Sequence, residues 1–202
     1  MKHQRSPRRR KRNLTKRRMR KIQRRKQRVL EWTRYAGILV AVGFFAFLLV
    51  LGFGLQINVT GDAMSPTISN GDIVLVNRTA YTLRRLRLGN LIAVSADGNP
   101  STNEIVRRVI GVAGDEVFIS EGMLYINGEA VDLESMGVES PIAFAGTASS
   151  AYTVREDQLF VMGDHTSNSI DSRMPDFGMI SRSDVMGRPW FVLHGQSFGF
   201  IR

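Results

Sequence analysis

Cysteine is absent from the 202-residue chain, and histidine is scarce, with three residues. Without thiols the chain can form no disulfide framework and has no thiolate nucleophile or cysteine metal ligand. The three histidines, His3, His165 and His194, are too widely spaced in the sequence to indicate a metal site. We therefore expect no metal ion and no other cofactor, and the lack of cysteine is compatible with either side of a membrane.

Acidic residues are nearly missing from the N-terminus. Residues 1–34 hold 17 Lys/Arg and one acid, Glu31, whereas residues 35–55 carry no charge. Because the whole chain has 28 Lys/Arg and 18 Asp/Glu, residues 56–202 keep 11 and 17 and are acidic. We predict a basic tail over 1–34, an apolar span over 35–55 and one domain over 56–202, long enough for a core of its own.

The uncharged stretch predicts a transmembrane helix. Its 21 residues would cover roughly the 30 Å of a bilayer core at about 1.5 Å per residue. A buried core helix and a cleavable signal peptide are the alternatives. Against a signal peptide, the basic region and the apolar run are both longer than usual, and no Ala-x-Ala-like site follows. The positive-inside rule then predicts a single-pass cell-membrane protein with residues 1–34 cytoplasmic and residues 56–202 extracytoplasmic.

The basic tail predicts contact with anionic lipid. Its Lys/Arg clusters could attract either nucleic acid or the headgroups of the bilayer. Aromatic residues for base stacking are absent before Trp32, which argues against a specific nucleic-acid partner. We expect the lipid bilayer as the tail's partner.

Residues after 55 show the short apolar or alternating runs, separated by turn residues, that are typical of an all-β domain. Glu121-Gly122 joins two of the predicted strands in a hairpin, and Asn127-Gly128 allows a second tight reversal. Residues 127–152 lack periodicity and are predicted to form a loop. The predicted strands span 72–77, 90–95, 104–112, 116–120, 123–126, 158–162 and 190–193.

Three motifs in order give this domain a family resemblance. The first is Gly61-Asp62-Ala63-Met64-Ser65-Pro66-Thr67-Ile68; the second begins at Arg107-Arg108-Val109-Ile110-Gly111; the third runs from Gly163-Asp164 to Arg173. Together they resemble the type I signal peptidases, which are membrane-anchored serine endopeptidases that cleave signal peptides from preproteins. The resemblance implies a mainly β fold, a signal-peptidase-like extracytoplasmic domain behind one N-terminal transmembrane helix.

The two positions that carry the family's catalysis are substituted in this chain. The family places its nucleophilic serine where this chain has Ala63, and its lysine general base where this chain has Arg107. Alanine offers no nucleophile, and a guanidinium does not lose its proton in a protein. By resemblance, therefore, no catalytic dyad is intact, and peptidase activity by the family mechanism should be absent.

The motifs around these two positions are kept. By resemblance, Asp164, Ser169, Asp171 and Arg173 would support the dyad, with Asp171 and Arg173 forming a charge-assisted pair. Arg108 would pair with one of these acids. The substrate groove would be formed by Gly61, Met64, Ser65 and Pro66, with no side-chain donor at Gly61 for the oxyanion.

The favoured function is a signal-peptidase-like protein that binds or helps assemble exported preproteins or secreted subunits, beside an active signal peptidase. The main alternative is an active signal peptidase with a non-standard dyad, for which Ser65 and His165 are the candidates. A third possibility makes the tail the functional part and the outer domain a passive anchor. The sequence also leaves open whether the two substitutions are natural or engineered.

Overall fold

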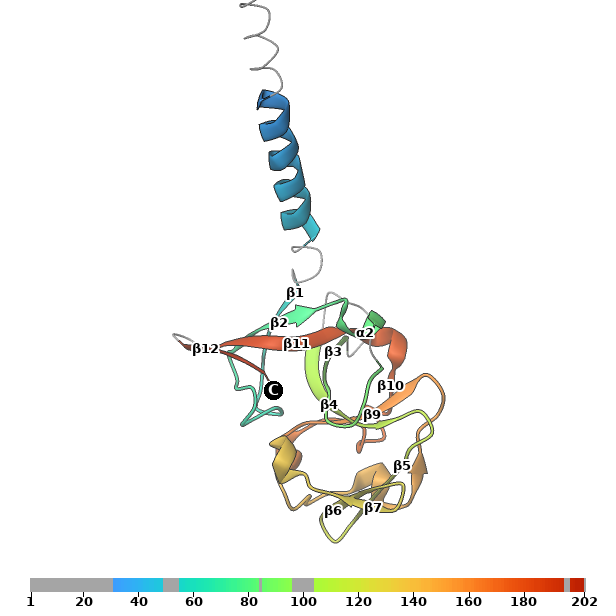
Figure 1. The fold of residues 1–202 in the computed structure, drawn as a ribbon. Helices are drawn as coiled ribbons and strands as arrows, with labels where there is room; N and C mark the ends of the chain where they lie inside the picture. Colours follow the sequence, from blue (N-terminus) through green and yellow to red (C-terminus); the bar gives the residue numbers. More distant parts are fainter. Residues whose placement is uncertain (1–30, 49–54, 84, 96–103, 195–196, 202) are drawn as a thin grey trace, which may run out of the picture. The chain divides into compact units, whose positions relative to one another are not determined.

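The computed structural model describes residues 31–48, 55–83, 85–95, 104–194 and 197–201 (Figure 1). The chain divides into two compact units, residues 1–50 and residues 51–202, and each is described by itself. Most of the predicted basic tail lies outside the described residues, so its lipid contact stays a prediction.

The described part of the first unit is one helix, Glu31–Leu48, which is long and apolar enough to cross a membrane. It covers the first two thirds of the predicted span. Residues 49–54 lie outside the described residues. Leu55, the last residue of the predicted span, is the first residue of a strand and pairs with Val76.

The second unit contains two antiparallel sheets. The larger has the order β1-β2-β11-β3-β4-β9-β10, with β12 paired to β11, and the smaller has the order β7-β6-β5-β8. The larger sheet is formed by β1 (Leu55–Asn58), β2 (Ile73–Asn77), β3 (Leu91–Ser95), β4 (Glu104–Val112), β9 (Gln158–Met162), β10 (Ile180–Ser181), β11 (Val185–His194) and β12 (Ser197–Phe200). The smaller is formed by β5 (Glu116–Ser120), β6 (Met123–Ile126), β7 (Glu129–Val131) and β8 (Tyr152–Thr153).

Turn residues with positive φ determine where the chain reverses between the strands of the smaller sheet. Glu121 (φ 53°) and Gly122 (φ 77°) connect β5 to β6, so the predicted hairpin is confirmed. Asn127 (φ 52°) and Gly128 (φ 83°) reverse the chain again into β7. Two consecutive residues of positive φ match the twist of antiparallel strands, which is why both connections need only two residues.

Hydrophobic side chains form three buried clusters. One lies between β9 and the smaller sheet and includes Phe160, Met162, Val117 and Leu124. Another, beneath β1 and β2, includes Met64 and Ile68, and the third joins β3, β4, β9 and β10. Met64 belongs to the first motif, so burial of its side chain anchors the segment that carries Ala63.

Strand β4 is shared between two neighbours. Its residues Glu104 to Arg108 pair with β3. Its residues from Arg108 onward pair with β9, and the register of this pairing shifts between Val109 and Gly111. Over Glu104–Arg107 the edge opposite β3 is therefore not paired to any described strand. β1, at one end of the strand order, likewise has a free edge opposite β2 among the described strands.

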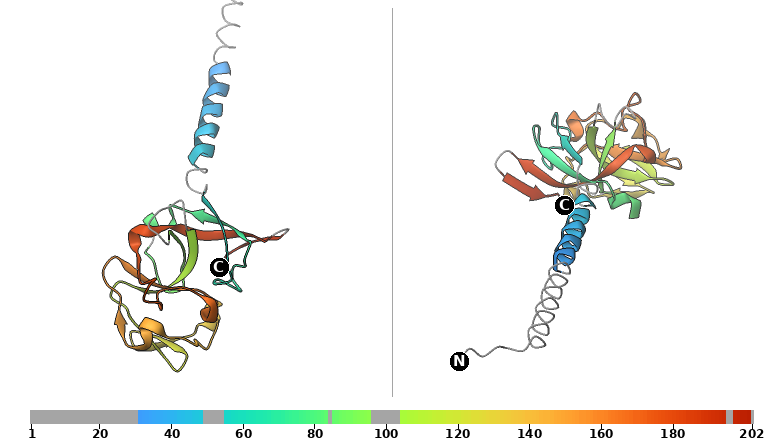
Figure 2. Two further views of the ribbon diagram at one scale, coloured as in Figure 1. Left: turned by 180° about the vertical axis from the view of Figure 1, so that it is seen from behind. Right: turned by 90° about the horizontal axis from the view of Figure 1, so that it is seen from above.

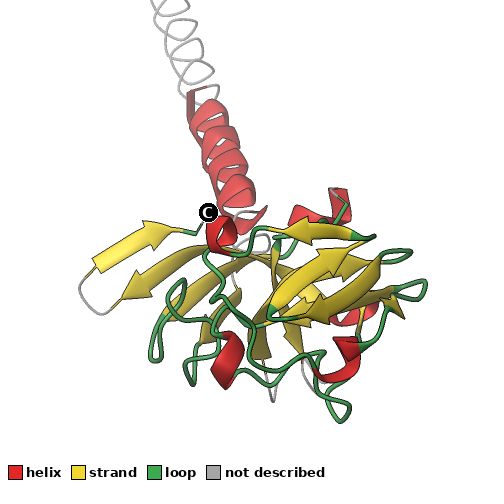
Figure 3. Ribbon diagram, turned by 90° about the horizontal axis from the view of Figure 1, so that it is seen from below, coloured by secondary structure: helices red, strands yellow, loops and turns green. Residues whose placement is uncertain are grey.

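The C-terminal strands form a hairpin that projects from the rest of the domain (Figures 2 and 3). Phe191 on β11 contacts two rings of β12, with centroid distances of 5.8 Å to Phe198 and 5.3 Å to Phe200. Such aromatic cross-strand pairs stabilise an antiparallel hairpin. The predicted strand at 190–193 was therefore too short, since β11 spans ten residues.

Several elements escaped the sequence patterns. The predicted loop over 127–152 contains β7, the first residue of β8 and two short 3₁₀ helices, Glu134–Met136 and Gly146–Ser149. Also not predicted were β1, β10, β12, the helix α2 (Ala80–Leu83) and the 3₁₀ helices Thr166–Asn168 and Arg182–Asp184. Nearly all of these elements are too short to show a period, and tertiary pairing decides their structure.

The packing around Phe160 gives a first prediction. Phe160→Ala should lower the free energy of unfolding by about 3–5 kcal/mol, because the ring is fully buried and its loss leaves a cavity. Phe144→Ala, at a half-exposed position, is the matched control and should cost less than about 1 kcal/mol. Urea unfolding of the full chain in detergent micelles measures both. Equal losses would contradict the assignment of Phe160 to the core.

Candidate functional site

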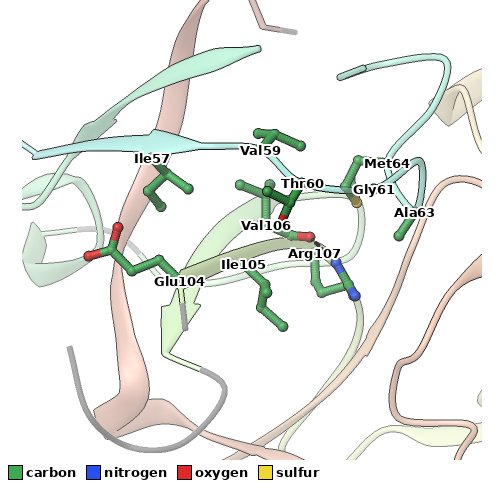
Figure 4. A pocket seen from close by; sticks show the side chains of 10 residues that line it. All are labelled: Ile57, Val59, Thr60, Gly61, Ala63, Met64, Glu104, Ile105, Val106 and Arg107. Carbon is green, nitrogen blue, oxygen red and sulfur yellow. Dashed lines mark hydrogen bonds between the residues drawn. The ribbon is translucent and has the colours of Figure 1, made fainter. Parts of the chain in front are cut away.

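A groove runs between the free edges of β1 and β4. The space of about 360 Å³ along its walls includes open solvent. One wall comes from β1 and the residues that follow it, and the other from the first residues of β4 (Figure 4). The lining residues are Ile57, Val59, Thr60, Gly61, Ala63, Met64, Glu104, Ile105, Val106 and Arg107.

Ala63 and Arg107, the two positions matched to the family's dyad, both line this groove. The main chain of Ala63 is held by the third motif, since its carbonyl oxygen accepts the His165 N–H at 3.1 Å. Gly163 packs so close that a Cβ there would collide with the Ala63 carbonyl and with the Ser169 side chain. The third motif therefore fixes where the Ala63 methyl group lies.

Arg107 is a buried cation in the groove wall. Its Nε and Nη2 donate to the Ile170 carbonyl oxygen at 3.1 and 2.9 Å, and its Nη1 donates to the Val106 carbonyl oxygen at 2.7 Å. Burial lowers the pKa of Arg107 from its usual value, and the nearby Asp171 partly offsets this effect. Arginine nevertheless stays protonated in proteins, so the group cannot accept a proton as a general base.

A second buried arginine ties the first motif to the third. Arg108 donates from Nε and Nη2 to the two carboxylate oxygens of Asp164, at 2.7 and 2.6 Å. Thr67 donates its hydroxyl hydrogen to the same carboxylate at 2.5 Å. The predicted pairing of Arg108 thus forms with Asp164, and it joins the segment after Ala63, strand β4 and the loop after β9.

The predicted pair of Asp171 and Arg173 is also present and fully buried. Nε and Nη2 of Arg173 lie 2.9 and 2.8 Å from the two carboxylate oxygens of Asp171. The same carboxylate accepts the Gly163 N–H at 3.0 Å. The remaining nitrogen of Arg173 donates to the Phe144 carbonyl oxygen at 3.1 Å. The pair thereby holds the Gly163 backbone that contacts Ala63.

Ser169 is the fourth predicted support residue, and its position is unlike the others. Its hydroxyl is buried and has no hydrogen-bond partner among the described residues. Arg107 bonds the carbonyl of the next residue, Ile170, instead. A buried hydroxyl without a partner is rare.

The predicted groove residues divide into two pairs. Gly61 and Met64 line the groove, whereas Ser65 and Pro66 are outside its lining. Gly61 has a φ of 84° and its N–H donates to the Asn70 side chain at 3.1 Å. Sequence reasoning missed the β1 wall and Glu104 to Val106, although the last three directly precede Arg107 in a predicted strand.

The residues proposed for a non-standard dyad do not meet. The Nδ1 atom of His165 lies 3.3 Å from the Asp62 carbonyl oxygen, and Nε2 lies 3.9 Å from Glu139. Within the described ranges no serine hydroxyl is bonded to either ring nitrogen. His194 contacts Asp72 at 2.8 Å. Among the described residues no group of three or more acids and histidines could hold a metal ion.

Comparison with known proteins decides the family. The family model described as signal peptidase, peptidase S26, matches residues 29–194. The chain belongs to this family. The resemblance that the three motifs indicated is therefore confirmed, and so is the signal-peptidase-like, β-rich fold behind one apolar N-terminal helix.

Relatives within the signal peptidase family cover most of the chain. Signal peptidase I S of Bacillus subtilis (strain 168) is 30% identical over 175 residues, which are 84% of this chain and 91% of the relative. Signal peptidase IB of Staphylococcus aureus (strain COL) is 28% identical, over 82% of this chain and 90% of the relative. A solved signal peptidase I from Enterococcus faecalis V583 is 27% identical, with a TM-score of 0.42, over 52% of this chain and 97% of that one.

The unpartnered hydroxyl gives a second prediction. Ser169→Ala should leave the free energy of unfolding unchanged or raise it by up to about 1 kcal/mol, because it removes a buried polar atom that has no partner. The matched control is Ser172→Ala. The Ser172 hydroxyl accepts the buried Val161 N–H at 3.0 Å, so its loss should cost about 1–3 kcal/mol. Thermal or urea unfolding of both variants provides the comparison, and a larger cost at Ser169 would contradict the geometry described.

Proposed function

We propose that this member of the signal peptidase family binds extended segments of exported polypeptides in its groove without cleaving them. The observation that carries the proposal is that a methyl group and a permanent cation, those of Ala63 and Arg107, face one groove. Hydrolysis by the family mechanism needs a hydroxyl and a neutral amine at these positions. The groove keeps its walls but has neither reacting group.

The free strand edges support peptide binding. β1 and the first half of β4 each leave one edge unpaired among the described strands, and both border the groove. An extended peptide can add to such edges through main-chain hydrogen bonds, with alternate side chains entering the groove. Ile57, Val59 and Val106 give that groove an apolar lining, which suits small apolar side chains.

The apolar helix and the distribution of charge along the chain support a membrane anchor and an orientation for the β domain. The helix Glu31–Leu48 can serve as the membrane anchor by length and composition. The excess of Lys/Arg before it supports an orientation with the N-terminus in the cytoplasm and the β domain outside the cell membrane. In this proposal the partners are exported preproteins or secreted subunits, together with an active signal peptidase that processes them.

The test is a cleavage assay of the full chain in lipid nanodiscs, with a preprotein that an active signal peptidase processes. The wild-type chain should give no product. The double variant Ala63→Ser, Arg107→Lys should cleave at the signal site, whereas Ala63→Ser alone should stay at background because Arg107 cannot accept the serine proton. Loss of a serine nucleophile costs on the order of a millionfold in a comparable hydrolase, or about 8 kcal/mol.

Specific cleavage by the wild-type chain would contradict the proposal. Ser65→Ala then identifies the cause: if this variant abolishes cleavage, Ser65 is the nucleophile of a non-standard dyad. A control with Ser183→Ala, at an exposed position of the Arg182–Asp184 turn, should leave any cleavage unchanged.

A further inference from the structure

Among the described residues of the second unit three arginines are buried, and one of them has no anionic hydrogen-bond partner there. Arg108 is paired with Asp164, and Arg173 is paired with Asp171. Arg107, which is 8% exposed, donates only to carbonyl oxygens. A buried charge is costly unless an opposite charge accompanies it. Arg107 is thus the buried cation whose counter-charge the described residues do not supply.

Asp171, the acid that acts on the charge of Arg107, already accepts hydrogen bonds from other groups. Asp171 attracts Arg107 electrostatically, but both of its oxygens accept hydrogen bonds from Arg173, and one also accepts the Gly163 N–H. Glu104 lies in the same groove without an ion pair to Arg107, and Figure 4 shows it at the opposite end, near Ile57. Neither carboxylate is hydrogen-bonded to the guanidinium, and the attraction from Asp171 offsets its burial only in part.

Arg107 also has donors to spare. A guanidinium carries five N–H groups, and three take part in the bonds to Ile170 and Val106. Two N–H groups, one on each terminal nitrogen, are left without an acceptor within the described part of the chain. The backbone N–H of Ala63, on the facing wall, also has no acceptor there. The end of the groove is therefore rich in donors and positively charged.

The groove ends where these donors lie. Figure 4 shows Ala63 and Arg107 at the end of the lining opposite Glu104 and Ile57, and the backbone of Gly163 and His165 contacts the Ala63 carbonyl. A polypeptide bound along the free strand edges with its C-terminus toward this end would place its last residue beside Ala63 and Arg107. Its terminal carboxylate would lie where donors and positive charge are unmatched.

We propose that the Ala63–Arg107 end of the groove recognises the free C-terminal carboxylate of an extended polypeptide. This inference rests on the proposed peptide-binding function and specifies its ligand: a chain terminus rather than an internal segment. A planar guanidinium binds a carboxylate through two parallel hydrogen bonds, and such charge-assisted bonds are about twice as strong as neutral ones. A peptide released by cleavage and the mature C-terminus of a secreted protein both carry this group.

The test compares two forms of one synthetic peptide, with the full chain in lipid nanodiscs and fluorescence anisotropy as the readout. The peptide is short and extended, has small side chains and ends in alanine. One form has a free C-terminal carboxylate, and the other has a C-terminal carboxamide. The free acid should bind about tenfold or more tightly, since amidation removes the charge and one acceptor oxygen. Binding of both forms with equal affinity would overturn the carboxylate inference and leave the peptide groove standing. No binding of either form would contradict the proposed function itself.

A third peptide separates a terminal carboxylate from a side-chain one. It carries an internal aspartate and an amidated C-terminus. If this peptide binds as tightly as the free acid, the site recognises any carboxylate and not the chain terminus, and the inference is wrong. Weaker binding than the free acid supports it.

Variants assign the effect to Arg107. Arg107→Met keeps a long stem without donors and should abolish the preference for acid over amide, whereas Arg107→Lys should keep part of it. Arg78→Met, at an exposed position away from this groove, should retain the full preference. Because a folding defect weakens both peptides alike, the ratio of their affinities is the quantity to compare. An unchanged ratio in Arg107→Met would overturn the assignment.

Discussion

The carboxylate of Asp164 is the contact on which the arrangement of the groove depends. It accepts hydrogen bonds from Thr67 of the first motif and from Arg108 of the second, and it belongs to the third. One fully buried acid thus joins three segments that are far apart in the sequence. Breaking such a pair leaves an uncompensated buried charge, at a cost of about 3–5 kcal/mol. The positions of Ala63 and Arg107 follow from this junction, because each lies within a few residues of one of its members.

The central strands could be predicted with their observed bounds, and the reason is local. Glu104–Val112, Glu116–Ser120, Met123–Ile126 and Gln158–Met162 are apolar or alternating runs limited by turn residues. β1 was missed because Leu55 continues an apolar run and only its pairing with Val76 makes it a strand. Very short strands such as β8 carry too few residues for a period, so long-range pairing alone defines them.

The candidate site could be predicted only in part from the sequence. The motifs predicted which residues would stand at the dyad positions, and the structure places both in one groove. The acceptors of Arg107 could not be predicted, because the Ile170 carbonyl approaches it only through tertiary folding. The same holds for the unpartnered Ser169 hydroxyl. Motifs indicate which chemical groups are present. Which hydrogen-bond donors and acceptors have partners can be known only from the folded structure.

The long-range pairing of β2 with β11 has a consequence for the order in which the domain assembles. β2 supports the β1 wall of the groove, and its other edge is covered by β11, in a register that joins Ile73 to Leu193. Pairings between such distant residues form slowly, because a long loop must close first. Until the chain has been synthesised as far as β11, the β1 wall therefore lacks this support. The β1 wall of the groove is therefore complete only after β11, far along the sequence of the domain, has paired with β2.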